Sequence, residues 1–309
     1  MLTFELYNGY RIPVIGYGTF PQKETLERNV PIAYNAGYRM IDTSDNYFNE
    51  EFLGKGLQQL KDADLSVITK FSQPTRTELF WKCFNDSFSA LHWEGNKGIY
   101  LLHWPYPYLW KLQWRMMEDL YLSGKCAAIG VCNFDEGYLL ELLKFCKVKP
   151  MINQFERHPL FQQQHLVELC KKEDIQVMSY SPFARMDDEL NINQTLERIA
   201  KKYGKSVNQI ILRWNIDTGC IPIPASSSEK HIQENIDVFD FQLTEEEVKE
   251  INCLDRGKRI RYNPRTRFDE KDKKSFWMKK LEITYPVIAT MITTSVRIRK
   301  KIMRIIKLG

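Results

Sequence analysis

The sequence predicts a (β/α)₈ barrel, and three observations support this prediction. Short runs rich in Ile and Val alternate with longer amphipathic stretches from about residue 37 to residue 254. The runs are too short for helices and recur at intervals of about 20–35 residues, a pattern that favours right-handed βαβ units and a parallel sheet. Seven or eight such units in about 250 residues are typical of a closed barrel.

The seven runs that we expect to form strands are, in chain order, 38–42 (YRMID), 65–70 (LSVITK), 98–103 (GIYLLH), 127–133 (AAIGVCN), 150–154 (PMINQ), 176–180 (QVMSY) and 220–224 (CIPIP). Helices are predicted over 135–147, 163–173 and 196–202, and Gly204 suits the end of the last. Thr244 followed by Glu247 forms a capping box, which predicts a further helix start.

At the N-terminus we expect a β-hairpin. A doubly wound open sheet is the alternative fold, and it would carry a glycine-rich turn after its first strand. The candidate turn, Gly16 to Thr19, lacks a third glycine and a following helix. We therefore interpret Gly16 to Thr19 as a turn of the hairpin.

The composition is that of a globular protein, with 43% hydrophobic and 27% charged residues. The seven cysteines show no paired or regular spacing, so reduced thiols are expected rather than a disulfide framework or a structural zinc site. The N-terminus does not read as a signal peptide, and the chain has no uncharged apolar run of about 18 residues. These features predict a cytoplasmic protein.

Charge is divided unevenly along the chain. Residues 258–309 contain 16 Lys and Arg against 4 Asp and Glu, which leaves 28 and 35 for residues 1–257. An acidic body argues against a nucleic-acid groove in the main fold. We predict that residues 1–268 form the barrel and that residues 269–309 are a basic extension.

Residues 283–309 have the pattern of a basic amphipathic helix. Ile298, Ile302 and Ile305 would share one face, while Arg297 and Lys301 would lie on another. One interpretation is peripheral contact with an anionic membrane. The other is packing on the barrel or on a second copy, and both stay open, as does the choice between a monomer and a weak dimer.

Polar side chains recur where the predicted strands end. In chain order they are Asp42, Lys70, His103, Asn133, Gln154 and Tyr180. Tyr47 follows Asp42 by five residues. Because all carboxyl ends of a barrel's strands point to one face, we expect these side chains to surround one site.

This set of residues suits the reduction of a carbonyl group. A tyrosine with a pKa near 10 is a poor acid unless a cation stabilises its phenolate. Lys70 can supply that cation and Asp42 can hold it, while His103 can orient a carbonyl oxygen. Such a site favours hydride transfer from a nicotinamide to a C=O carbon.

From about residue 4 to residue 268 the chain resembles the aldo-keto reductase family. The stretches that carry this resemblance are GYRMIDTSDNYFNEEFLG (37–54), LLHWP (101–105), GKCAAIGVCNF (124–134), INQFERHP (152–159), MSYSPF (178–183) and IPIPASSSEKHIQEN (221–235). Their number and order make the resemblance specific. It implies NAD(P)H-dependent reduction of an aldehyde or ketone.

The resemblance also implies roles for individual residues. The catalytic set would be Asp42, Tyr47, Lys70 and His103, with Tyr47 as proton donor. Tyr180 would stack on the nicotinamide, and Asn133 and Gln154 would bind its carboxamide. The other cofactor residues implied are Gly18, Thr19, Cys132, Ser181, Phe183, Ser226, His231, Glu234 and Asn235. Phe20, Phe48 and Trp104 would form the wall of the substrate pocket.

Some positions depart from the family pattern. Ala225 stands where the family commonly has a lysine, and His231 where it commonly has an arginine near the 2′-phosphate of the cofactor. We therefore expect NADP(H), with NAD(H) as the alternative. Ser72 occupies a position where a pocket tryptophan often sits, which predicts a more open pocket.

Two other functions compete with the reductase. One is a redox-inactive nucleotide-binding scaffold or regulatory subunit, recruited to a membrane by the basic extension. The other is a metal-dependent barrel hydrolase. His103, His158 and His165 match no ligand spacing, so no metal site is expected.

Overall fold

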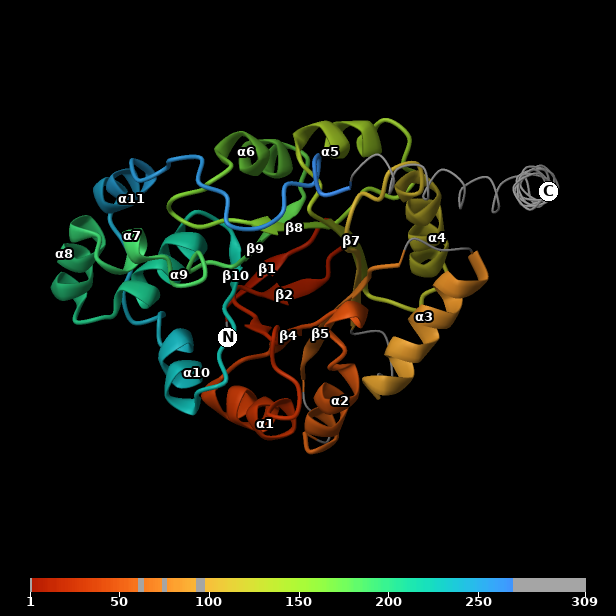
Figure 1. Cartoon of the computed structure of the whole chain (residues 1–309), viewed down its shortest axis with the longest axis horizontal. Helices are drawn as coiled ribbons and strands as arrows, with labels where there is room; N and C mark the ends of the chain where they lie inside the picture. Colours follow the sequence, from red (N-terminus) through yellow and green to blue (C-terminus); the bar gives the residue numbers. More distant parts are fainter. Residues whose placement is uncertain (1, 61–63, 74–76, 93–97, 269–309) are drawn as a thin grey trace, which may run out of the picture.

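The computed structural model describes residues 2–60, 64–73, 77–92 and 98–268 (Figure 1). The predicted extension 269–309, with its amphipathic pattern, lies outside these described residues. The predicted boundary at residue 268 coincides with the end of the described chain, and the division into two parts stays a prediction.

Eight parallel strands form the barrel, as predicted. They are β3 (Tyr17–Gly18), β4 (Met40–Asp42), β5 (Ser66–Phe71), β6 (Gly98–Leu102), β7 (Ala128–Cys132), β8 (Ile152–Glu156), β9 (Gln176–Tyr180) and β10 (Ile221–Ile223). Each strand pairs with its neighbours in sequence. The amides of Gly16 and Gly18 donate to the carbonyls of Pro222 and Pro224 at 3.1 and 2.8 Å. These bonds join β3 to β10 and close the sheet.

The predicted N-terminal hairpin is formed by β1 (Thr3–Glu5) and β2 (Arg11–Pro13). Its turn lies between these strands, so the interpretation of Gly16 to Thr19 as the hairpin turn was wrong. Tyr17 and Gly18 instead form the first barrel strand, too short to show a hydrophobic period. Leu6 and Ile12 pack with Ile99 and other residues of the barrel interior and cover one end of it.

Helices surround the sheet (Figure 1). They are α1 (Leu26–Ala36), α2 (Glu50–Gln58), α3 (Thr77–Ala90), α4 (Trp110–Leu122), α5 (Glu136–Leu143), α6 (Gln164–Lys172), α7 (Asp188–Asn191), α8 (Gln194–Tyr203), α9 (Val207–Asp217), α10 (Glu229–Ile236) and α11 (Glu245–Asn252). Gly204 ends α8 in the left-handed conformation, and Thr244 and Glu247 form the capping box of α11, both as predicted.

A segment without regular structure follows α11 and runs back to the carboxyl ends of the strands. The buried carboxylate of Glu156 on β8 accepts hydrogen bonds from the backbone N–H groups of Ile260 and Arg261, at 2.6 and 2.9 Å. Arg265 forms an ion pair with Asp135 at the start of α5. We call residues 256–268 the C-terminal segment, and these contacts fix it over the carboxyl face of the barrel.

Within the described ranges, no helix combines the length and the apolarity that crossing a membrane requires.

Candidate active site

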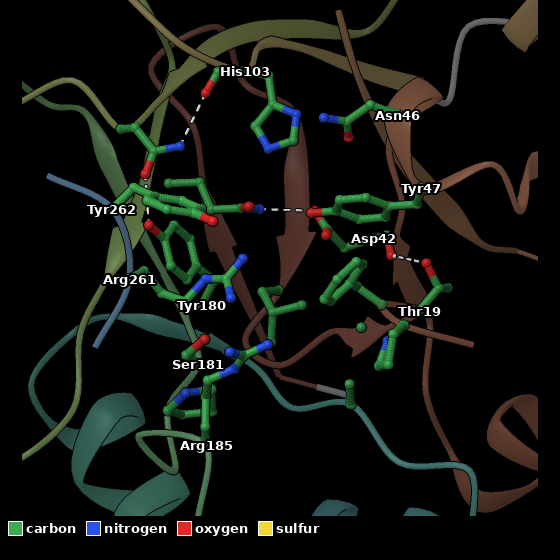
Figure 2. A pocket seen from close by; sticks show the side chains of 18 of the residues that line it. Thr19, Asp42, Asn46, Tyr47, His103, Tyr180, Ser181, Arg185, Arg261 and Tyr262 are labelled. Carbon is green, nitrogen blue, oxygen red and sulfur yellow. Dashed lines mark hydrogen bonds between the residues drawn. The ribbon is translucent and has the colours of Figure 1, made fainter. Parts of the chain in front are cut away.

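A cavity of about 410 Å³ opens at the carboxyl ends of the strands (Figure 2). The predicted site residues that line it are Gly18, Thr19, Phe20, Asp42, Tyr47, His103, Trp104, Asn133, Gln154, Tyr180, Ser181 and Phe183. They come from six different strands or the loops that follow them. The barrel thus brings together residues that are far apart in the sequence.

Asp42 and Lys70 form a buried ion pair at the base of this cavity. Lys70 Nζ lies 2.7 Å from Asp42 Oδ1 and also donates to the carbonyl of Thr43. The Lys70 side chain is fully buried. Burial acts to lower the pKa of Lys70, but the Asp42 carboxylate acts against it and the net pKa lies above its usual value. Lys70 therefore stays protonated at neutral pH.

Tyr47 belongs to the short 3₁₀ helix η1 (Asp45–Tyr47), which follows β4. Its ring points into the cavity (Figure 2), and Lys70 Nζ lies 5.2 Å from the ring centroid. Burial raises the pKa of Tyr47 to about 12, while the positive charge of Lys70 acts in the opposite direction. The expected effect of Lys70 is thus present, but burial outweighs it and the hydroxyl is protonated at neutral pH.

His103 follows β6, and its ring makes an edge contact with the ring of Tyr47 at 5.9 Å between centroids. Its Nδ1 lies 2.6 Å from Ser72 Oγ and 3.0 Å from Ser44 Oγ. Burial, helped by the charge of Lys70, holds the pKa of His103 well below its usual value. The imidazole is therefore neutral, and a serine hydroxyl that donates to Nδ1 would place the ring proton on Nε2.

Asn133, in the loop after β7, forms hydrogen bonds to residues at the ends of β6 and β9. Its side-chain N–H donates to the carbonyl of His103 at 3.0 Å, and its Oδ1 accepts from the Tyr180 hydroxyl at 2.6 Å. The backbone of Asn133 is left-handed (φ 63°), a conformation that Asn tolerates better than most residues. Gln154 Nε2 donates to Asp42 Oδ2 at 2.8 Å, so this amide supports the ion pair.

The cavity wall also contains residues that were not predicted. They are Pro21, Asn46, Pro182, Arg185, Met186, Ile223, Ala225, Arg261, Tyr262 and Arg267. Arg261, Tyr262 and Arg267 belong to the C-terminal segment, whose sequence has no helical or strand period. The only signal in the sequence was the unusual density of arginine in RIRYNPRTR (259–267).

Other predicted residues lie away from this cavity. Phe48 is 74% exposed and does not line it. Cys132 is buried behind the wall, where burial raises the pKa of its thiol. Ser226 and, on α10, His231, Glu234 and Asn235 lie outside the lining. Their roles toward the cofactor stay predictions.

Within the part of the chain that the structure describes, no group of three or more His, Cys, Asp or Glu side chains could hold a metal ion.

Fold and site together define an α/β-barrel oxidoreductase with its site at the carboxyl face. The sequence model of the aldo/keto reductase family matches residues 14–256. The chain is 39% identical to glyoxal reductase of Bacillus subtilis over 267 residues, which are 85% of this chain and 96% of that protein. It is 40% identical over 266 residues to 9,11-endoperoxide prostaglandin H2 reductase of Trypanosoma cruzi, covering 84% and 93% of the two chains.

Solved structures agree with this result. An aldo-keto reductase of Bombyx mori in complex with NADP superimposes with a TM-score of 0.78 and 32% identity, covering 88% of this chain and 96% of that one. An aldo-keto reductase from a deep-sea metagenome library gives a TM-score of 0.80 and 37% identity, covering 84% and 97%.

The chain belongs to the aldo/keto reductase family. It is an oxidoreductase that reduces carbonyl groups with NADP(H). The interpretation as a redox-inactive scaffold finds no support in these comparisons.

Proposed function

We propose that the protein reduces a small aldehyde or ketone to the alcohol, with Tyr47 as the proton donor. The observation that carries this proposal is the group formed by Tyr47, Lys70 and His103, in which Tyr47 and His103 line the cavity and Lys70 is buried beside Tyr47. The Tyr47 ring touches both the Lys70 ammonium group and the His103 imidazole, at 5.2 and 5.9 Å between the groups. Relatives named for glyoxal and methylglyoxal reduction support a small carbonyl substrate.

Each side chain has a distinct task in this mechanism. Neutral His103 donates from Nε2 to the carbonyl oxygen and orients it toward Tyr47. Tyr47 gives its proton to that oxygen as the carbonyl carbon gains a hydride, and Lys70 stabilises the phenolate left behind. Asp42 and Gln154 hold Lys70 in place. When bound, NADPH supplies the hydride.

The walls of the cavity fit the cofactor. Tyr180 offers a flat ring at the cavity edge, held by Asn133 through the bond described above. A Cβ added at Gly18 would meet the backbone carbonyls of Ile223 and Pro224 at 3.1 and 3.3 Å, so the close approach of β3 to the chain after β10 favours glycine here. We propose that Tyr180 stacks on the nicotinamide and that Ser181, with Arg185 nearby, faces the phosphates.

Replacement of Tyr47 by phenylalanine tests the proton donor. Tyr47→Phe is expected to lower kcat for carbonyl reduction by at least about 100-fold, because the general acid is lost. NADPH binding, measured by quenching of protein fluorescence, should change less than about twofold. Methylglyoxal reduction by the variant at a wild-type rate would overturn the assignment.

A further inference from the structure

Two guanidinium groups flank the proposed proton-transfer residues. The Arg267 guanidinium lies over the Trp104 ring at 4.1 Å, and that ring stacks beside His103 at 6.0 Å between centroids. The Arg261 guanidinium lies 5.9 Å from the ring of Phe20, and both guanidinium groups lie over the ring of Tyr262, at 5.8 and 4.6 Å. Phe20 in turn contacts the Tyr47 ring at 5.0 Å. Both arginines line the cavity in which the carbonyl would react.

Neither of these arginines has an acidic partner among the described residues. Their neighbours differ in this respect, because Arg259 and Arg265 form ion pairs with Glu156 and Asp135. Arg267 Nε is buried and makes no hydrogen bond within the described chain. A buried donor without an acceptor is unfavourable, so an arrangement in which a ligand oxygen accepts from Arg267 would be favoured.

Aromatic rings contact both guanidinium groups and hold them at the cavity. Arg267 stacks on Trp104 and Tyr262, at 4.1 and 4.6 Å. Stacking uses the face of a guanidinium, and its N–H groups point outward in the plane, where they match the two oxygens of a carboxylate or phosphate. Asp42, the acidic residue in the cavity lining, is already committed to Lys70 and Gln154.

We propose that the substrate is a carbonyl compound that also carries a carboxylate or phosphate group, and that Arg261 and Arg267 bind this group. The inference rests on the reductase function proposed above and names its substrate class. The charged group is unchanged in the reaction, in which the carbonyl carbon gains a hydride and the oxygen gains the Tyr47 proton. Arg185 follows Ser181 on the loop after β9 rather than on the C-terminal segment (Figure 2), and we assign it to the cofactor phosphates.

Matched substrates test the proposal. With saturating NADPH, kcat/KM is measured for 4-oxobutanoate and its methyl ester, and for glyceraldehyde 3-phosphate and glyceraldehyde. We expect a preference of at least about tenfold for the charged member of one pair or both, because a hydrogen bond to a charged group is worth about 1.5–3 kcal/mol. The pair with the larger preference identifies the oxyanion. Added salt should reduce the preference.

Variants then locate the preference. Arg261→Gln and Arg267→Gln should each lower kcat/KM for the charged substrate by about 10- to 100-fold and for the neutral one by less than about threefold. Arg267→Lys should retain part of the preference. Arg256→Gln is the control, since Arg256 is exposed, carries the same charge, and its side chain donates to the carbonyls of Cys253 and Asp255 in its own turn.

The outcomes separate the two proposals. Equal kcat/KM for charged and neutral substrates in the wild type would overturn the proposal of an anionic substrate. It would leave the proposed reduction of neutral carbonyl compounds intact. Variants that weaken NADPH binding as much as substrate binding would show that the arginines serve the cofactor, which also overturns it. A wild-type rate in Tyr47→Phe would instead overturn the assignment of Tyr47 as the proton donor.

Discussion

Removal of the buried Lys70 ammonium group should destabilise the protein as well as inactivate it. Lys70→Met leaves the Asp42 carboxylate in the interior with Gln154 as its remaining side-chain partner among the described residues. Breaking a buried ion pair in this way costs about 3–5 kcal/mol, because the surviving charge has lost its counter-ion. Asp42→Asn should cost a similar amount. The free energies of unfolding are measured in urea at neutral pH.

A double-mutant cycle isolates the contribution of the pair. We expect Lys70→Met combined with Asp42→Asn to be at least about 2 kcal/mol more stable than the sum of the single effects, since no unpaired charge remains. The double variant should stay inactive. The exposed pair Lys82–Asp86, at 2.6 Å, is the control, and Lys82→Met should leave the free energy of unfolding nearly unchanged. Additive effects at Lys70 and Asp42 would refute the reasoning.

Three further predictions concern groups around the cavity. Ser72→Ala should lower kcat/KM up to about tenfold through loss of one hydrogen bond to His103, without changing NADPH binding; an unchanged kcat/KM would contradict this role. Because the pKa of Tyr47 is raised to about 12 and that of His103 lowered, kcat/KM for reduction should be flat between about pH 6 and 9. A limb near pH 6.5 that disappears in His103→Gln would argue against a neutral imidazole. Glu156→Gln should speed proteolysis within residues 256–268, because a single amide oxygen replaces a carboxylate that accepts two backbone N–H bonds. Equal cleavage rates in the variant and the wild type would count against Glu156 as an anchor.

The contribution of the Glu156 carboxylate to the free energy of unfolding also depends on pH. Burial acts to raise its pKa, but hydrogen bonds from His158 and from the backbone of the C-terminal segment lower it overall. A depressed folded pKa means that the stabilisation is present above the usual value near 4.5 and is lost as pH falls through the lower folded value.

Much of the fold could be predicted because its strands are short buried runs at regular spacing. Seven strand segments and the capping box at Thr244 were found from the pattern of residues alone, whereas β3 was missed because it is two residues long and contains a glycine. The side chains of the proposed catalytic set were found because each ends a strand, or follows one closely, and the barrel directs all strand ends to one face.

The rest of the site could not be predicted because it depends on contacts between distant residues. Glu156 and Ile260 are 104 positions apart, and no local period indicates that one anchors the other. Arg261 and Arg267 therefore could not be placed beside His103 from the sequence. The hydrogen bond between Ser72 and His103 could not be predicted either, because its geometry depends on the pairing of β5 with β6.

The anchoring of the C-terminal segment by Glu156 has a consequence for how specificity can change. The proposed catalytic side chains stand on the strands of the barrel or follow them closely, whereas Arg261, Tyr262 and Arg267 stand on a segment that Glu156 and Asp135 anchor. We expect that another segment of similar length could take its place, provided that it still offers two N–H groups to the Glu156 carboxylate. New substrate preferences could thus be installed by grafting about a dozen residues onto an unchanged scaffold.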